Sequence, residues 1–208
     1  MTALSLASLI ASRLCHDLIG PVGAFSNGLE LMEMEEDPAM RDSAVELLQH
    51  SASLATDKLK YLRLAFGASG GDQNGLDMGS VRAAVHAYYA DSRFTINWPD
   101  SPTGDNDIPK LMIRLLMNLM MSASTALFRG GEIQVLVSAS AIQLVCNNPD
   151  ARLNDDIVNA LTGVTVAEKH EHARIIEAFL AHAIARDINA KITVDQSTNG
   201  FVISARTG

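Results

Sequence analysis

Residues 3–35 read ALSLASLIASRLCHDLIGPVGAFSNGLELMEME, and their hydrophobic side chains recur at steps of three or four. This spacing puts them on one side of an α-helix, where they form a continuous hydrophobic stripe. The stripe comprises Leu6, Ile10, Leu14, Leu18, Val22, Phe25, Leu29 and Met32. The sequence therefore predicts one helix of many turns, which is longer than an average globular helix.

A second long helix is expected after a short connection. Asp37 suits an N-cap, Pro38 suits the first helical position, and hydrophobic residues continue on one side from Met40 to Phe66. We expect Gly67 to end this helix as a left-handed cap. Two long helices joined by a few residues lie antiparallel. Because such a hairpin cannot bury both stripes alone, the pattern favours a dimeric four-helix bundle, although docking on the rest of the chain would also serve.

The remainder of the chain forms a second domain. Residues 68–79, rich in Gly and Asn, predict a linker between a hairpin domain at 1–67 and a domain at 80–208. Helices are expected at 80–89, 109–128, 155–161 and 165–188, and strands at 94–98, 132–138, 142–147, 191–195 and 201–206. This order predicts an α+β fold in which helices pack on one face of a mixed sheet as an α/β sandwich.

The composition excludes several classes of protein. The 208 residues are 48% hydrophobic, which is enough to bury a core, so disordered and fibrous proteins are excluded. The net charge of -8 argues against direct binding to nucleic acid or to an anionic membrane, because both need clustered positive charge. The sequence has no hydrophobic run long enough to span a membrane and no signal peptide pattern. We therefore expect a cytoplasmic protein with protein or small-molecule partners.

His16 is the strongest candidate for chemistry. At about 100° per residue its ring points away from the hydrophobic stripe, so we expect it to be exposed. Asp17 is adjacent, and the next turns contain Gly20, Pro21 and Gly23, which a helix accommodates only at a cost in stability. These small residues would let the surface of another protein approach the imidazole. We interpret His16 as a functional nucleophile rather than an ordinary surface histidine.

At this point the sequence resembles a known family. Residues 14–21, LCHDLIGP, resemble the H-box of sensor histidine kinases, in which a phosphorylatable His precedes an acidic residue and, four residues later, a Pro. The run CHDLIGPVGA at 15–24, continued by SNGLE at 26–30, is similar to the ChpT-type histidine phosphotransferases of alphaproteobacteria. The resemblance implies a homodimer, a phosphorylated His16, and an Asp17 that orients or activates it. It also implies a surface that docks receiver domains, which we assign to Ser12, Arg13, Ile19, Gly20, Pro21 and Gly23.

The second domain resembles the ATP-binding domain of histidine kinases in element order but lacks its nucleotide motifs. An N-box carries two Asn four residues apart, whereas this chain has Asn118 followed by Ser122. CNNPDAR at 146–152 replaces the Asp-x-Gly-x-Gly motif, and VAEKHEHA at 166–173 replaces the Gly-rich phosphate loop. Bulky side chains thus stand where backbone donors would cradle phosphate. We expect a degenerate domain that binds no ATP and helps to grip receivers.

Without ATP, the expected activity is a phosphoryl relay. The resemblance implies that His16 accepts a phosphoryl group, on Nε2, from the receiver aspartate of a hybrid histidine kinase and passes it to response regulators. The receivers bring the Mg²⁺, so we expect no cofactor or metal ligands of the chain's own. The family is associated with cell-cycle relays, with regulators of the CtrA type. The alternatives are a divergent ATP-dependent histidine kinase and a non-catalytic dimeric adaptor that binds response regulators.

Other residues receive structural interpretations. We expect Cys15 to lie in the core, because adjacent helical residues diverge by about 100° and His16 is exposed. His170 and His172 are two positions apart and face opposite sides of a helix, which predicts a solvated face rather than a metal site. Tyr88 and Tyr89 are assigned to packing, and the Met residues at 112–121 to soft core filling.

Overall fold

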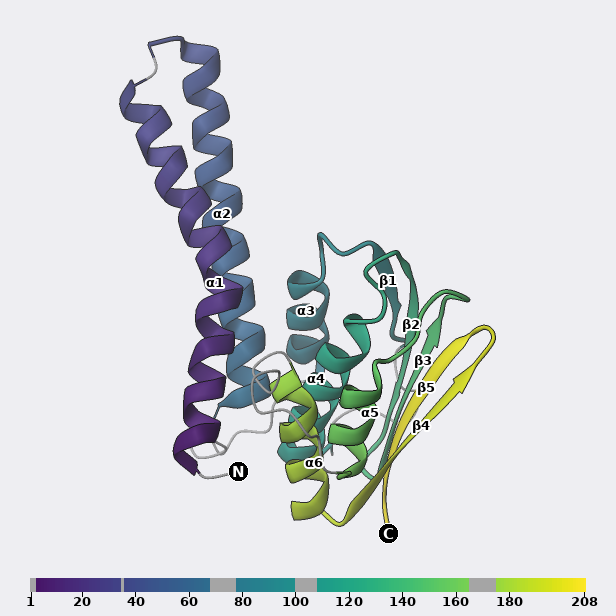
Figure 1. The fold of residues 1–208 in the computed structure, drawn as a ribbon. Coiled ribbons are helices and arrows are strands. Elements are labelled where there is room, and N and C mark those ends of the chain that lie inside the picture. The colour runs from purple at the N-terminus through teal and green to yellow at the C-terminus, as the bar shows by residue number, and fades with distance from the viewer. Residues whose placement is uncertain (1–2, 35, 68–77, 100–107, 165–174) are drawn as a thin grey trace.

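The computed structural model describes residues 3–34, 36–67, 78–99, 108–164 and 175–208. The helices are α1 (Ala3–Met34), α2 (Pro38–Phe66), α3 (Met78–Tyr88), α4 (Lys110–Ser124), α5 (Asp155–Thr162) and α6 (Ile176–Asp187). The strands are β1 (Phe94–Asn97), β2 (Gly131–Val137), β3 (Ala141–Asn147), β4 (Ala190–Ser197) and β5 (Gly200–Thr207). Helices α1 and α2 form an antiparallel hairpin beside a domain in which α3 to α6 cover one face of the sheet (Figure 1). The predicted α+β fold is confirmed.

The sheet is mixed, with strand order β1-β2-β3-β5-β4. Strand β1 runs parallel to β2, and every other neighbouring pair is antiparallel. Alternate side chains of each central strand are buried, as expected for a sheet with one covered face. The predicted hairpin of β2 and β3 is present, with Ile133 opposite Cys146 and Val135 opposite Leu144.

Helix α4 forms the centre of the core and also contacts the hairpin. Its Met side chains are buried, so their predicted role as core filling is confirmed. The hydroxyl of Tyr61 on α2 donates to the carbonyl of Met117 at 2.8 Å, and the amide of Asn118 donates to the carbonyl of Ala65 at 2.9 Å. Both bonds are buried, so the hairpin is attached to the second domain through α4.

Helix α4 ends earlier than predicted. We expected it to reach Phe128, but it stops at Ser124. There the hydroxyls of Ser124 and Thr125 donate to the carbonyls of Met121 and Ser122, at 2.8 and 2.7 Å. These side chains take up the carbonyls of the last turn, and a turn follows.

The end of α2 and the linker differ from the prediction in detail. Gly67 has φ -61° and ψ 151°, so it is extended rather than left-handed. Glycine is still required there, because a Cβ would collide with the carbonyl of Arg63. The linker was predicted to end at residue 79, but Met78 and Gly79 already belong to α3. Its remaining residues, 68–77, and the predicted helix start at 165–174 lie outside the described residues.

The hydrophobic stripe of α1 is only partly covered within this chain, as expected for a hairpin that cannot bury its stripes alone. The face toward α2 buries Asp17, Pro21 and Gly28. At Gly28 the helices approach so closely that a Cβ would lie 2.9 Å from Cγ of Leu48. The other face carries hydrophobic side chains that are exposed in this chain, and they include Val22, Phe25 and Leu29.

Candidate functional site

His16 is exposed on the surface of α1, as predicted. Its side chain is 82% exposed, and its Nδ1 lies 3.1 Å from Oδ1 of Asp17. Within the described part of the chain no hydrogen bond is made by Nε2. When Nδ1 donates its proton to the carboxylate, Nε2 carries a free lone pair that faces solvent. The arrangement therefore presents one ring nitrogen as a nucleophile.

Asp17 is buried, although its neighbour His16 is exposed. Only 9% of its side chain is accessible, and its Oδ2 accepts hydrogen bonds from Nε of Arg13 at 3.0 Å and from the hydroxyl of Tyr88 at 3.3 Å. Oδ2 of Asp17 thus accepts two hydrogen bonds, and Oδ1 faces the His16 ring. Tyr88 belongs to α3, so the second domain reaches the site.

Arg13 connects Asp17 to α6. Its Nη1 lies 3.5 Å from Oε2 of Glu177, a fully buried residue of the second domain. Burial alone would lower the pKa of Arg13, but the carboxylates of Glu177 and Asp17 outweigh it and raise that pKa. Burial raises the pKa of Glu177, and the rather long contact with Arg13 opposes this only in part. Arg13 is therefore a permanent cation inside an intramolecular network.

A second cation, Lys58, contacts the backbone of Asp17. Pro21 has no backbone N–H, so the carbonyl of Asp17, four residues earlier, has no helical partner. Nζ of Lys58, on α2, donates to that carbonyl at 3.1 Å. Lys58 thereby satisfies a group that Pro21 leaves free, and it brings positive charge to the turn that carries His16.

Three tyrosines join the two domains next to this network. The rings of Tyr61 and Tyr88 stack with centroids 4.0 Å apart, and Tyr89 packs edge-on against both. The sequence contains no other tyrosine. The packing role predicted for Tyr88 is confirmed, but that prediction missed its hydrogen bond to Asp17.

The predicted docking residues do not all reach the surface. Ser12, Ile19, Gly20 and Gly23 are exposed, but Pro21 is buried and Arg13 is held by Asp17 and Glu177. A Cβ added at Gly20 or Gly23 would meet nothing within 4 Å. Packing among the described residues therefore does not require either glycine. Of the six residues predicted to dock receivers, the exposed ones are Ser12, Ile19, Gly20 and Gly23, and we call these four the exposed docking set.

Cys15 is exposed, so its predicted place in the core is wrong. The prediction assumed that a residue about 100° around the helix from exposed His16 would be buried. Cys15 instead lies on a side of α1 that this chain leaves exposed. Cys146 on β3 is the buried thiol, and burial raises its pKa to about 12. The predicted solvated face at His170 and His172 lies outside the described residues.

The residues that stand in place of the nucleotide motifs are engaged by the protein itself. The amide of Asn118 donates to Ala65 and Arg114 carbonyls, and the hydroxyl of Ser122 donates to the Asn118 carbonyl. In the loop after β3, Nδ2 of Asn148 donates to the carbonyl of Gly130 at 2.6 Å. The segment that replaces the phosphate loop, 166–173, lies outside the described residues.

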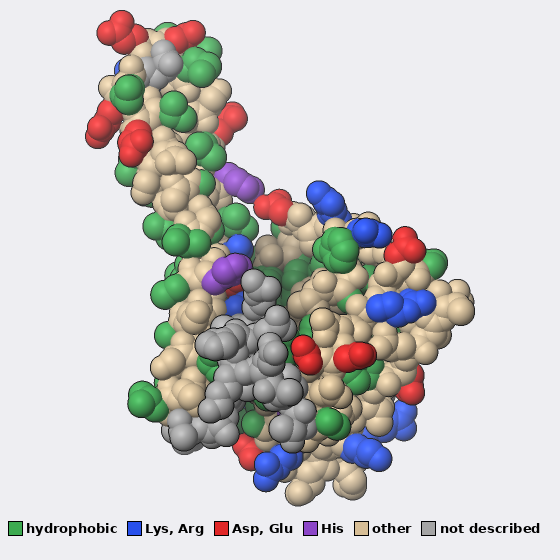
Figure 2. Space-filling model, in the orientation of Figure 1, with side chains coloured by type: hydrophobic (Ala, Val, Ile, Leu, Met, Phe, Trp, Pro, Cys, Tyr) green, Lys and Arg blue, Asp and Glu red, His purple; other side chains and the backbone are tan. Residues whose placement is uncertain are grey.

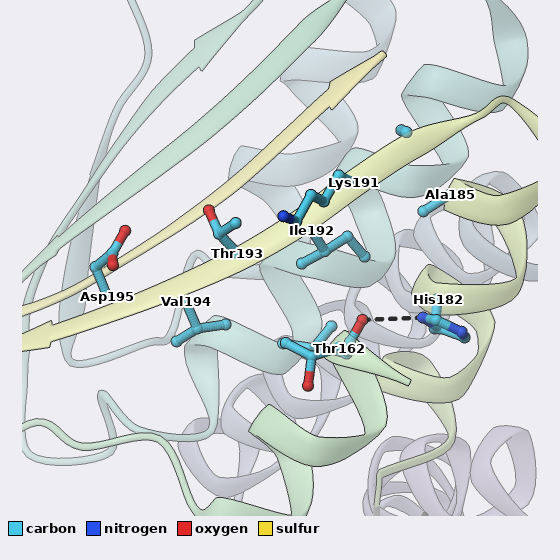
Figure 3. Close-up of a pocket in the computed structure, with 10 residues that line it drawn as sticks. Thr162, His182, Ala185, Lys191, Ile192, Thr193, Val194 and Asp195 are labelled. Atoms are coloured by element: carbon cyan, nitrogen blue, oxygen red, sulfur yellow. Dashed lines mark hydrogen bonds between the residues drawn. The ribbon is translucent and has the colours of Figure 1, made fainter. Parts of the chain in front are cut away.

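A shallow pocket of about 550 Å³ lies between α5, α6 and β4 (Figure 3). Its lining includes His182, whose Nδ1 lies 3.2 Å from the carbonyl of Leu161, and the strand residues Lys191 and Asp195. None of the described lining residues belongs to the hairpin, and the pocket is separate from His16.

Among the described residues, no group of three or more His, Cys, Asp or Glu side chains is placed to hold a metal ion.

The surface of the hairpin is uneven in character. Hydrophobic side chains are spread along it, whereas acidic side chains gather at the tip far from the second domain (Figure 2). In the described ranges, none of the helices combines the length and hydrophobicity that crossing a membrane requires.

Sequence reasoning missed three residues of the site: Lys58, Tyr88 and Glu177. Lys58 had an indirect signal, because Pro21 inside a helix implies an unpaired carbonyl at Asp17. Tyr88 and Glu177 had none, since they meet α1 only through the tertiary fold. Glu177 is 164 positions from Arg13.

The chain is similar to known proteins over most of its length. Residues 78–200 match the family model described as the histidine phosphotransferase C-terminal domain. The chain is 29% identical over 215 residues to the protein phosphotransferase ChpT of Brucella abortus (strain 2308), covering 99% of this chain and 97% of that one. It also matches a solved structure of a bacterial phosphotransferase with a TM-score of 0.79 and 26% identity, covering 99% of this chain and 98% of the other.

Proposed function

The chain belongs to the histidine phosphotransferase family and is a phosphotransferase of a phosphorelay, and on that premise we propose that His16 carries the phosphoryl group. The group would come from the receiver aspartate of a hybrid histidine kinase and pass to the receivers of response regulators. The observation that carries this proposal is the exposed Nε2 of His16, with Nδ1 bound to a buried carboxylate. Asp17 is then the residue that orients the ring.

The chemical step needs no proton acceptor from the chain. Nε2 of His16 attacks the phosphorus of the aspartyl phosphate, and an N–P bond forms while the acyl O–P bond breaks. The receiver carboxylate leaves with the electron pair. Nδ1 keeps its proton, so the ring becomes positively charged next to Asp17, whose negative charge stabilises it. The reverse sequence returns the phosphoryl group to a second receiver, and the receivers supply the Mg²⁺.

The exposed docking set surrounds the reactive nitrogen. At about 100° per residue, Gly20 and Gly23 lie within about 40° of His16 around the helix, and Ile19 within about 60°. The glycines leave open space that no described residue fills, and Ile19 is 74% exposed. We assign this face to the receiver, because phosphoryl transfer requires the two reacting atoms to come close together.

The opposite face of α1 is assigned to a homodimer. Val22 and Leu29 lie about 120° to 140° around the helix from His16 and are 55% and 46% exposed. Burying such a stripe against a second hairpin gives a four-helix bundle.

Val22→Asp should therefore produce monomers in light scattering after size exclusion. Ile19→Asp should remain dimeric and yet slow transfer, and the same behaviour of both variants would refute the division into two faces.

We further propose that the chain has no ATP-dependent kinase activity. The amides of Asn118 and Asn148 are bonded to the protein backbone in the region where a kinase holds its nucleotide. Incubation with radiolabelled ATP and Mg²⁺ should leave the chain unlabelled. Autophosphorylation without any receiver would instead identify a divergent histidine kinase.

The decisive experiment is a three-component transfer assay. A phosphorylated receiver should label the wild-type chain, the labelled chain should pass the group to a second receiver, and His16→Ala should accept no label. Label retained by His16→Ala would refute the assignment. Receiver binding with no transfer by the wild type would identify an adaptor.

A further inference from the structure

We propose that Tyr88 and Glu177, both in the second domain, are positioning residues for phosphoryl transfer: they hold Asp17 so that one carboxylate oxygen is left for Nδ1 of His16. This inference rests on the proposed function of His16. It assigns to the second domain a direct part in orienting the nucleophile, in addition to any contact with receivers.

The argument begins with the division of the Asp17 oxygens. Oδ2 accepts from Nε of Arg13 and from the hydroxyl of Tyr88, and Oδ1 faces Nδ1 of His16. Two donors that converge on one oxygen fix the rotation of the carboxylate about its Cβ–Cγ bond. The His16 ring is largely exposed, and among the described residues its side-chain hydrogen-bond partner is Asp17. The orientation of Asp17 therefore decides which tautomer the ring adopts.

Arg13 is itself held from the second domain. One edge of its guanidinium bonds Asp17 and the other meets Glu177 on α6. A buried ion pair with a long contact is a weak source of stability, because desolvation offsets the attraction. Oε1 of Glu177 is also buried without a hydrogen-bond partner in the described structure, which adds to the cost. Stability therefore does not explain why Glu177 is buried here, whereas the position that Glu177 gives to the Arg13 side chain does.

Attachment of the two domains does not need this network. The bonds from Tyr61 to Met117 and from Asn118 to Ala65 already connect the hairpin to α4, and neither involves Asp17. What Tyr88 and Glu177 add is contact with the turn of α1 that carries His16. A purely structural role would therefore leave the His16 ring unchanged when these contacts are lost.

The test uses variants that retain side-chain size. Tyr88→Phe removes only the hydroxyl, and Glu177→Gln removes only the charge. Tyr89→Phe is the matched control, since its hydroxyl contacts Tyr61 and its ring belongs to the same cluster. Two-bond proton–nitrogen spectra of histidine-labelled protein report the tautomer of each ring. The His16 signal is identified by its loss in His16→Ala.

We expect Tyr88→Phe and Glu177→Gln to lower the fraction of His16 protonated on Nδ1. Transfer from a receiver charged with acetyl phosphate should slow by about three- to tenfold, the effect of one lost hydrogen bond. Tyr89→Phe should match the wild type in both measurements. If the tautomer or the rate in the test variants equals that of Tyr89→Phe, the positioning role is refuted. If wild-type transfer proves independent of His16, the proposed function fails, whereas the tautomer spectra still decide whether the second domain orients the ring.

Discussion

Nζ of Lys58 donates a hydrogen bond to the backbone carbonyl of Asp17, and this is the carbonyl that Pro21 leaves without a helical partner. The bond replaces one missing from the helical ladder and ties α1 to α2 at the level of His16. It explains how α1 continues through a proline from Ala3 to Met34.

Removing the hydrogen bond from Lys58 to Asp17 should destabilise the protein more when Pro21 is present than when it is replaced. Lys58→Met should lower the free energy of unfolding by about 1 to 2 kcal/mol, because a partly buried carbonyl loses its donor. In a Pro21→Ala background the restored backbone N–H bonds Asp17, so the same substitution should cost less than half as much. Urea unfolding of the four proteins measures the coupling. An equal cost in both backgrounds would contradict this account.

The glycines of α1 should respond to alanine in opposite ways. Gly23→Ala meets only open space, so it should stabilise the helix by about 1 kcal/mol and still slow transfer if a receiver docks there. Gly28→Ala would crowd Leu48 and should destabilise by about 1 to 3 kcal/mol. Denaturant unfolding and transfer rates are measured side by side. Gly23→Ala with unaltered transfer would remove Gly23 from the docking surface.

The tyrosine cluster predicts an alkaline transition. Burial raises the pKa of Tyr61, Tyr88 and Tyr89, that of Tyr89 to about 12. In the unfolded chain tyrosine ionises at about pH 10, so above that pH the unfolded state is stabilised and the folded state is not. The contribution to stability is thus full below about pH 10 and is lost as pH rises toward the folded pKa values. Tyrosinate absorbance should appear together with the loss of helical circular dichroism. Ionisation of one tyrosine in the native protein would show that the cluster is more open.

The two thiols should differ in reactivity. Cys15 is exposed, whereas Cys146 is buried with a pKa raised to about 12, so little of it is the reactive thiolate at neutral pH. An aromatic disulfide reagent should modify one thiol of the native chain and both thiols in denaturant. Cys15→Ser should abolish the fast reaction. A fast reaction that persists in this variant would mean that β3 opens readily.

Local patterns were sufficient to predict most of the fold. The hydrophobic spacing of residues 3–35, the Asp37–Pro38 helix start and the alternation in β2 and β3 depend on neighbouring residues, and all are confirmed. The exposure of His16 follows in the same way from its angle on the helix. The prediction failed where burial depended on which other elements cover a given side of α1. Cys15 was expected to lie in the core, and it is exposed.

The sequence by itself determined the elements, their order and the nucleophilic candidate, because helix and strand periods, caps and turns are encoded within a few residues. Only the tertiary structure decided what surrounds Asp17. Lys58 reaches it from α2, Tyr88 from α3, and Glu177 acts on it from α6 through Arg13. Contacts between residues 41 to 164 positions apart leave no periodic signal in the chain, because they arise from how the finished helices pack.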